Sequence, residues 1–212
     1  MNVHDIIEAI SNLSKRRPVF YSEADFQFAL AWELQKILPC GANIYLERLW
    51  QHGGLKYYVD IWVEENGKKY PIELKYKTKA AQIQCPKIGT VISLNNHSAN
   101  DFGCYDYLHD IKRIEDIKLH ESSAFGKGYA VFLTNDSNYY NNSGRKSAYS
   151  NFKIYQGAVR TGELKWGLTQ NGKPFVCGTR GNFSLSGNYT MDWSDYNKEV
   201  VPEFKYLINE IG

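Results

Sequence analysis

The stretch YYVDIWVEENGKKYPIELKYK, residues 57–77, decides the fold of this chain. Two runs rich in Val, Ile, Tyr and Trp flank Asn66-Gly67, a dipeptide typical of tight β-hairpin turns. If these two residues form the turn, the register places Asp60 directly opposite Glu73. The stretch therefore predicts a β-hairpin that brings two carboxylates together.

Period-2 alternation gives this hairpin two different faces. The apolar face is expected to contain Val59, Ile61, Val63, Ile72 and Leu74, and the other face Asp60, Glu73, Lys75 and Lys77. Facing carboxylates lie ~5 Å apart at Cβ and repel each other. A divalent cation, Mg²⁺ or Mn²⁺, would compensate them. The alternative is a solvent-facing strand side that carries charges by chance.

Two further residues of the hairpin affect this interpretation. Lys75 is placed to orient or deprotonate an attacking water, or to balance charge on a phosphate. Pro71 cannot donate to the β-ladder, so we expect its strand either to lie at a sheet edge there or to carry a bulge. A bulge would shift the pairing by one residue.

The pattern of Asp60 followed by Glu73-Leu74-Lys75 resembles the signature of the PD-(D/E)XK nuclease superfamily. The resemblance implies a restriction-endonuclease-like α/β fold, a mixed central sheet flanked by helices. It also implies Mg²⁺- or Mn²⁺-dependent hydrolysis of nucleic acid, with DNA as the expected substrate. In this family the two acids bind the metal, the middle residue lends its backbone carbonyl, and the Lys assists the water. Val59 stands where the family formally has Pro.

A helix upstream supplies a third acid. Ser22 and Asp25 approximate a capping box, and the helix is expected to run to Leu38, before Pro39. Its apolar stripe contains Phe26, Leu30, Leu34 and Ile37. Glu23 falls within this stripe, where an unpaired carboxylate is costly to bury, although the helix dipole alone would also favour an acid in the first turn. The family often adds a Glu from such a helix, which makes Glu23 a candidate metal ligand.

Hydrophobic spacing predicts the remaining elements. We expect helices over residues 3–13 and 100–117, strands over 43–50 and 128–134, a partly ordered loop over 78–100, short strands after Lys165, and a closing helix from the spacing of Phe204, Leu207, Ile208 and Ile211. Asp106, Asp110 and Arg113 share one side of the helix over 100–117, and we interpret that side as a solvated ion-pair face.

The length of 212 residues suits a single domain spanning residues 1–212. The nuclease-like core is expected over about 20–135, and a β-rich C-terminal elaboration over about 150–212.

Charge and aromatic content bear on whether the chain binds nucleic acid. The net charge of +2 gives no global signal for nucleic acid, but basic residues cluster locally at Lys75, Lys77, Lys79 and again at Arg145-Lys146. The 16 Tyr and 5 Trp would suffice to stack on unpaired bases, although a place in the core is the default for most of them.

Four scattered cysteines form no CxxC pair, which argues against zinc and a disulfide framework and favours a reducing cytoplasm. The acidic N-terminus is unlike a signal peptide, and no apolar run is long enough for a membrane span, so no membrane partner is expected.

Two functions from different classes fit these features. The first is a metal-dependent nuclease, and the alternative is a catalytically silent member of the same fold that binds nucleic acid or protein. The full set of Glu23, Asp60, Glu73 and Lys75 favours the nuclease, because a binding-only protein has no reason to bring acids close to phosphates. A third interpretation takes the motif as coincidence and the glycine-rich tail as an interaction surface. No base-reading motif is visible, so neither specificity nor oligomeric state is predicted.

Overall fold

A computed structural model of the chain describes residues 1–85, 89–169, 171–173, 175 and 178–212. The helices are α1 (Val3–Arg16), α2 (Glu23–Ile37), α3 (Asn100–Glu121), the short α4 (Ser137–Tyr140) and the 3-10 turn η1 (Ser150–Phe152). The strands are β1 (Asn43–His52), β2 (Leu55–Glu65), β3 (Lys68–Lys77), β4 (Ala81–Cys85), β5 (Thr90–Leu94), β6 (Gly128–Thr134), β7 (Val159–Leu164), β8 (Phe183–Thr190), β9 (Trp193–Asn197) and β10 (Phe204–Ile211).

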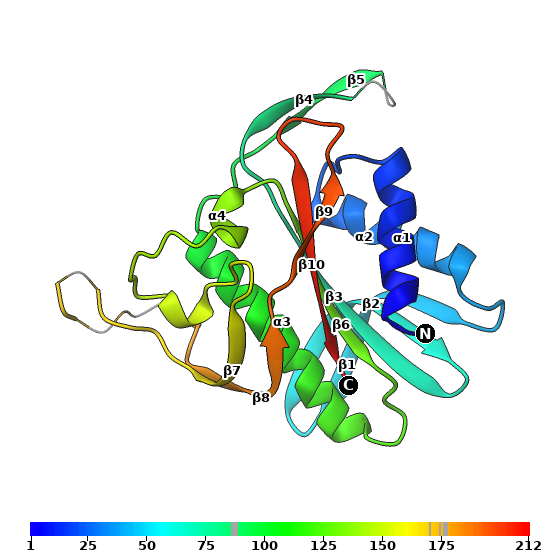
Figure 1. Ribbon diagram of the computed structural model, residues 1–212. Helices are drawn as coiled ribbons and strands as arrows, with labels where there is room; N and C mark the ends of the chain where they lie inside the picture. Colours follow the sequence, from blue (N-terminus) through cyan, green and yellow to red (C-terminus); the bar gives the residue numbers. More distant parts are fainter. Residues whose placement is uncertain (86–88, 170, 174, 176–177) are drawn as a thin grey trace.

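The fold is α/β, with a mixed six-stranded central sheet in the order β1-β2-β3-β6-β10-β9. The β3–β6 pair is parallel, and the other pairs of this sheet are antiparallel. Helices α1 and α2 pack on one face of the sheet, and α3 packs on the other together with the β7–β8 hairpin (Figure 1). Both faces of the central strands are therefore buried, and all seven residues of β6 are inaccessible to solvent.

The β2–β3 hairpin has the predicted register as far as Ile61 and Ile72, but the ladder ends there, so the predicted direct pairing of Asp60 with Glu73 does not form. Asn66 and Gly67 both take positive φ angles, 51° and 72°, as a type I′ turn requires. Of the two alternatives expected at Pro71, the bulge is absent, because Pro71 pairs in register with Trp62 and no shift interrupts this ladder. The edge is present locally, because the pairing of β3 with β6 starts only at Ile72. Pro71 therefore precedes the stretch in which β3 pairs on both sides.

One detail of the predicted hairpin faces is wrong. Ile61 and its neighbours of the same parity pack in the cluster beneath α1 and α2, whereas Val59 packs in the cluster beneath α3. The alternation of β2 therefore shifts between these two residues, at Asp60. Directly across the β1–β2 pair, Glu47 has a φ of 50° and falls between the paired residues of the ladder. This left-handed residue marks a local irregularity of β1 opposite Asp60, without a change of register.

The predicted closing helix is also wrong, because residues 204–211 form strand β10. In this segment Phe204 belongs to the cluster under α1 and α2, whereas Leu207 and Ile211 belong to the cluster under α3. A strand buried on both faces has apolar residues on both, so its sequence loses the period of two and imitates a helical spacing. The C-terminal segment thus adds β10 and β9 to the central sheet.

Residues 78–100, expected to be a partly ordered loop, contain the two-stranded β4–β5 ribbon. The other predicted helices and strands are present near their expected bounds. No helix in the described part of the chain is long and apolar enough to cross a membrane. Cys40 and Cys104 are free thiols, whereas the side chain of Cys85 and all of Cys177 lie outside the described residues.

Candidate active site

The candidate site lies where β2 and β3 separate. The antiparallel pairing of the hairpin reaches Ile61 and Ile72. After Ile72, backbone N–H groups of β3 that no longer pair with β2 donate hydrogen bonds to carboxylates. Asp60 Oδ2 accepts the N–H of Leu74 at 2.6 Å, and Glu23 Oε2 accepts the N–H of Tyr76 at 2.8 Å. The two acids predicted from different elements are therefore bound to alternate residues along the same edge of β3.

Asp60 is held from two sides. Its backbone carbonyl accepts the side-chain amide of Gln27 from α2 at 2.6 Å, and the same amide nitrogen lies 2.7 Å from Glu47 Oε1. Burial raises the pKa of Asp60 to about 6, and the carboxylates of Asp110 and Glu23 push in the same direction, while Lys75 opposes them. The Asp60 carboxylate is thus destabilised in its charged form and suited to a cationic partner.

Glu73 is the most deeply buried acid of the site, with 1% of its surface exposed. Neither carboxylate oxygen receives a well-directed hydrogen bond, although Arg113 lies at ion-pair distance, 3.1 Å from Oε1. Burial, followed by the charge of Asp110, raises the pKa of Glu73 well above its ordinary value, against the pull of Arg113. A buried carboxylate with unsatisfied oxygens needs either a proton or a cation.

Lys75 lies among these acids. Its Nζ is 2.6 Å from Asp110 Oδ2 and donates to the backbone carbonyl of Leu74 at 2.9 Å. Burial alone would lower the pKa of Lys75, but four carboxylates, those of Asp110, Glu23, Asp60 and Glu73, raise it above its ordinary value. The surrounding acids therefore favour the charged ammonium form of Lys75.

Asp110 and Arg113 of α3 complete the cluster, and the interpretation of their helix side as a solvated face is wrong. Asp110 is 4% exposed, and its Oδ2 makes no well-directed hydrogen bond, although it lies at ion-pair distance from Lys75. The guanidinium of Arg113 contacts Asp110 Oδ1 at 3.3 Å and donates to the carbonyl of Tyr58 at 2.5 Å. Only Asp106 lies nearer the surface, in an ion pair with Arg180.

A signal for Asp110 was present in the sequence. Tyr107, Ile111 and Ile114 form a buried stripe of α3, and position 110 is three residues after the first of them and four before the last. An acid inside an apolar stripe is the criterion that selects Glu23 in α2. Applied to α3, the same criterion selects Asp110.

The cluster carries excess negative charge. Counted as ionised, four carboxylates, from Glu23, Asp60, Glu73 and Asp110, face two cations, Lys75 and Arg113. The raised pKa of Asp60 and of Glu73 means that the cluster favours the uptake of protons or of a further cation. In the arrangement observed, however, no three His, Cys, Asp or Glu side chains of the described residues are grouped closely enough to hold a metal ion. Instead of a metal ion, Lys75 contacts Asp110 and Arg113 contacts Glu73.

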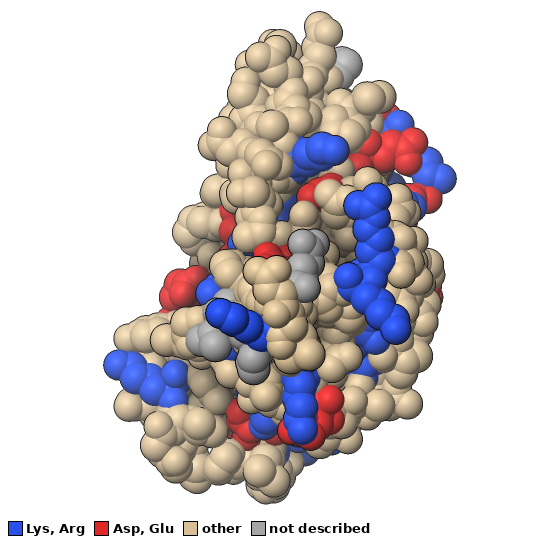
Figure 2. Space-filling view, turned by 90° about the vertical axis from the view of Figure 1, so that its left-hand side faces the viewer, with Lys and Arg blue, Asp and Glu red and all other residues tan. Residues whose placement is uncertain are grey.

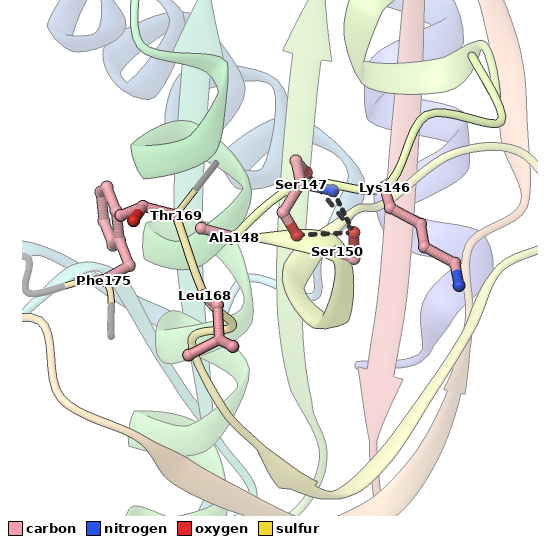
Figure 3. Close-up of a pocket in the computed structure, with 7 residues that line it drawn as sticks. All are labelled: Lys146, Ser147, Ala148, Ser150, Leu168, Thr169 and Phe175. Carbon is pink, nitrogen blue, oxygen red and sulfur yellow. Dashed lines mark hydrogen bonds between the residues drawn. The ribbon is translucent and has the colours of Figure 1, made fainter. Parts of the chain in front are cut away.

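The carboxylate cluster lies apart from the cavities formed by residues after β6. One of these, about 700 Å³, is lined by Lys146, Ser147, Ala148, Ser150, Leu168, Thr169 and Phe175 (Figure 3). Its two serines bond to each other, with Ser150 Oγ 2.8 Å from the backbone nitrogen of Ser147. No acid is among the described residues that line it.

In comparisons with known proteins, no protein-family model, no curated protein and no solved structure matches the chain.

Proposed function

We propose that this protein is a Mg²⁺- or Mn²⁺-dependent nuclease with a restriction-endonuclease-like fold. The observation that carries the proposal is the pair of Asp60 and Glu73 where β2 and β3 diverge, with Lys75 beside both. The order of elements supports it: helix α2, the β1–β2–β3 meander, helix α3, and β6 parallel to β3. DNA is the proposed substrate.

The residues present suit a divalent cation. Glu73 is a buried carboxylate whose oxygens make no well-directed hydrogen bond and have Arg113 as an ion-pair partner, and the formal charges of the cluster are four negative and two positive. Asp60 and Glu73 would hold the ion, with Glu23 as a third or water-mediated ligand, as the resemblance implies. A cation bound there would supply Lewis-acid activation of water.

The chain's own groups have distinct parts in this proposal. Asp60 and Glu73 are ordered before any ion binds, because the Leu74 N–H fixes one and Arg113 the other. Lys75 would leave its contact with Asp110 when the ion arrives and direct its ammonium to the phosphate or to the attacking water. Gln27 fixes the backbone of Asp60 and is a positioning residue.

One observation favours the second candidate, a catalytically silent module of the same fold. Arg113 already pairs with Glu73, and Lys75 already pairs with Asp110. Such internal ion pairs neutralise part of the site without a metal. The two candidates therefore differ in whether a divalent cation can displace these contacts.

Cleavage assays separate the candidates. Purified protein is incubated with duplex, single-stranded and branched DNA in Mg²⁺ or Mn²⁺, with a chelator as control. We expect cleavage that the chelator abolishes and that Asp60→Asn abolishes while the fold survives, because the side chains are nearly isosteric. Asp195→Asn is the matched control, since this exposed acid pairs with lysines of the β9–β10 end. Absence of cleavage on every substrate would favour the silent module.

The variant Lys75→Ala separates a role of Lys75 in turnover from a role in metal binding. Because Lys75 is assigned to water or phosphate, its loss should slow turnover and spare metal binding. Loss of metal binding in this variant would show that the ammonium is needed to build the site.

A further inference from the structure

The segment that follows the catalytic motif has an unusual charge pattern. Residues 74–100 contain four lysines and no Asp or Glu, although the chain has 23 acids in 212 residues. This segment leaves the end of β3 at Lys77 and includes the β4–β5 ribbon before α3 begins. Of its four lysines, Lys75 is buried in the carboxylate cluster and Lys87 lies outside the described residues, which leaves Lys77 and Lys79 beside the cluster. The lack of acids in this segment is compatible with a polyanion that approaches the cluster.

The ribbon has one buried and one exposed face. Ile83 and Ile92 pair with each other and are 1% exposed, within the hydrophobic cluster under α1 and α2. On the outer face, Gln82 pairs with Ser93, and Gln84 lies two residues further along β4; all three are exposed. The ribbon is therefore anchored to the core, and its outer face presents these three hydrogen-bonding side chains together with Val91, which pairs with Gln84 and is 55% exposed.

The base of the ribbon is tied to the candidate site. Lys79 exchanges two hydrogen bonds with the Asn135 side chain at the end of β6, at 2.8 and 3.1 Å. His97, on the return segment, bonds the N–H of Thr78 at 3.0 Å. Both Lys77 and the site acid Glu23 lie close enough to His97 to influence its pKa. The ribbon thus rises from the immediate surroundings of the carboxylates.

The shape of the ribbon indicates its partner. In Figure 1 it stands at one end of the molecule, beyond the sheet, and in Figure 2 the corresponding uppermost surface is mostly free of charged side chains. The major groove of B-DNA admits a two-stranded β-ribbon, and Gln and Ser side chains bond to base edges there. Lysines at the ribbon base, Lys77 and Lys79, are placed to meet the phosphates beside the groove.

We propose that the β4–β5 ribbon enters the major groove of duplex DNA and holds the duplex against the carboxylate cluster. This inference rests on the proposed nuclease function for its choice of partner, but binding can be measured without cleavage. It names duplex DNA as the substrate class and Gln82 and Gln84 as the residues that contact it.

The test places acids on the ribbon. Gln82→Glu with Gln84→Glu is nearly isosteric at two exposed positions, so the fold should survive, which circular dichroism and thermal unfolding verify. Ser184→Asp with Asn188→Asp, on exposed positions of the β7–β8 hairpin, is the control with the same change in net charge. Affinity is measured by fluorescence anisotropy in a chelator, with a labelled mixed-sequence duplex and its single strands.

We expect the ribbon variant to lose about tenfold or more in duplex affinity at low salt, since two acids would face the negative groove. The control should stay within about twofold of the wild type, and the single strands should be affected less than the duplex. Equal loss in both variants, equal loss for duplex and single strands, or altered self-association with unchanged DNA affinity would each overturn the proposal.

The outcomes for ribbon and enzyme can be told apart. A ribbon-dependent loss of duplex binding in a protein that cleaves nothing would retain the ribbon and reject the nuclease. Metal-dependent cleavage by the wild type, with unchanged duplex binding in the ribbon variant, would retain the nuclease and reject the ribbon as its DNA-binding element.

Discussion

Replacing Arg113 by Met tests the electrostatics of the candidate site. The substitution removes the guanidinium that lies 3.1 Å from Glu73 and 3.3 Å from Asp110, and it keeps an unbranched apolar side chain. Glu73 is 1% exposed, so its charge loses its nearest positive partner without gaining solvent. Breaking a buried ion pair from one side costs roughly 3–5 kcal/mol. For a protein of this size each kcal/mol lowers Tm by about 2–4 °C, so the expected fall is at least about 6 °C.

Urea unfolding monitored by circular dichroism measures this loss. Lys112→Met is the matched control on the same helix, because Lys112 forms a more exposed ion pair with Asp116, and such pairs contribute about 1 kcal/mol or less. Adding Mg²⁺ should restore more stability to Arg113→Met than to the wild type, since the cation takes over the role of the guanidinium. A loss no greater than that of the control would refute the assigned role of Arg113.

Further predictions concern other parts of the structure. Gln27→Leu should lower kcat more than it changes KM, because it releases the backbone of Asp60; unchanged kcat in steady-state cleavage would remove Gln27 from the site. Burial raises the pKa of Asp60 to about 6, so the stability this acid contributes to the metal-free protein is complete below pH 4 and lost as pH rises through about 6. Mg²⁺ should therefore raise Tm more at pH 8 than at pH 5, and an equal shift at both values would contradict proton competition. Glu115→Gln should cost roughly 1–3 kcal/mol in urea unfolding and spare cleavage, because this buried acid accepts two backbone N–H groups and a tyrosine hydroxyl of β8. Gly103→Ala should destabilise by roughly 1–3 kcal/mol, since its Cβ would lie 2.2 Å from the Tyr139 hydroxyl; wild-type stability would show that this ring moves freely.

The hairpin was the most predictable part of the site. Asn66-Gly67 fixes the turn and hence the register, and this register brings Asp60 and Glu73 to the point just beyond the last pair, Ile61 and Ile72, where the strands separate. Glu23 was predictable for another reason, because an acid in an apolar stripe needs a partner. Local signals were sufficient in both cases, since turn chemistry and helical periodicity act over a few residues.

The parts that sequence reasoning missed depend on long-range packing. Arg113 and Asp110 look like an ordinary surface ion pair within one helix, and only the docking of α3 on β3 buries them. Strand β10 was mistaken for a helix because helices and loops cover both of its faces. The ribbon over 78–100 was missed because its strands are short and its apolar residues few.

Direct binding of Mn²⁺ tests the central claim, that the carboxylates at the β2–β3 divergence form a divalent-cation site. Electron paramagnetic resonance of free Mn²⁺ counts the ions bound by the wild type and by Asp60→Asn. We predict at least one ion per chain at millimolar or lower concentrations of Mn²⁺, bound more weakly at acid pH, because protons compete for a carboxylate whose metal-free pKa is raised to about 6, and lost in the variant. No binding by the wild type, or equal binding by Asp60→Asn, would contradict the account.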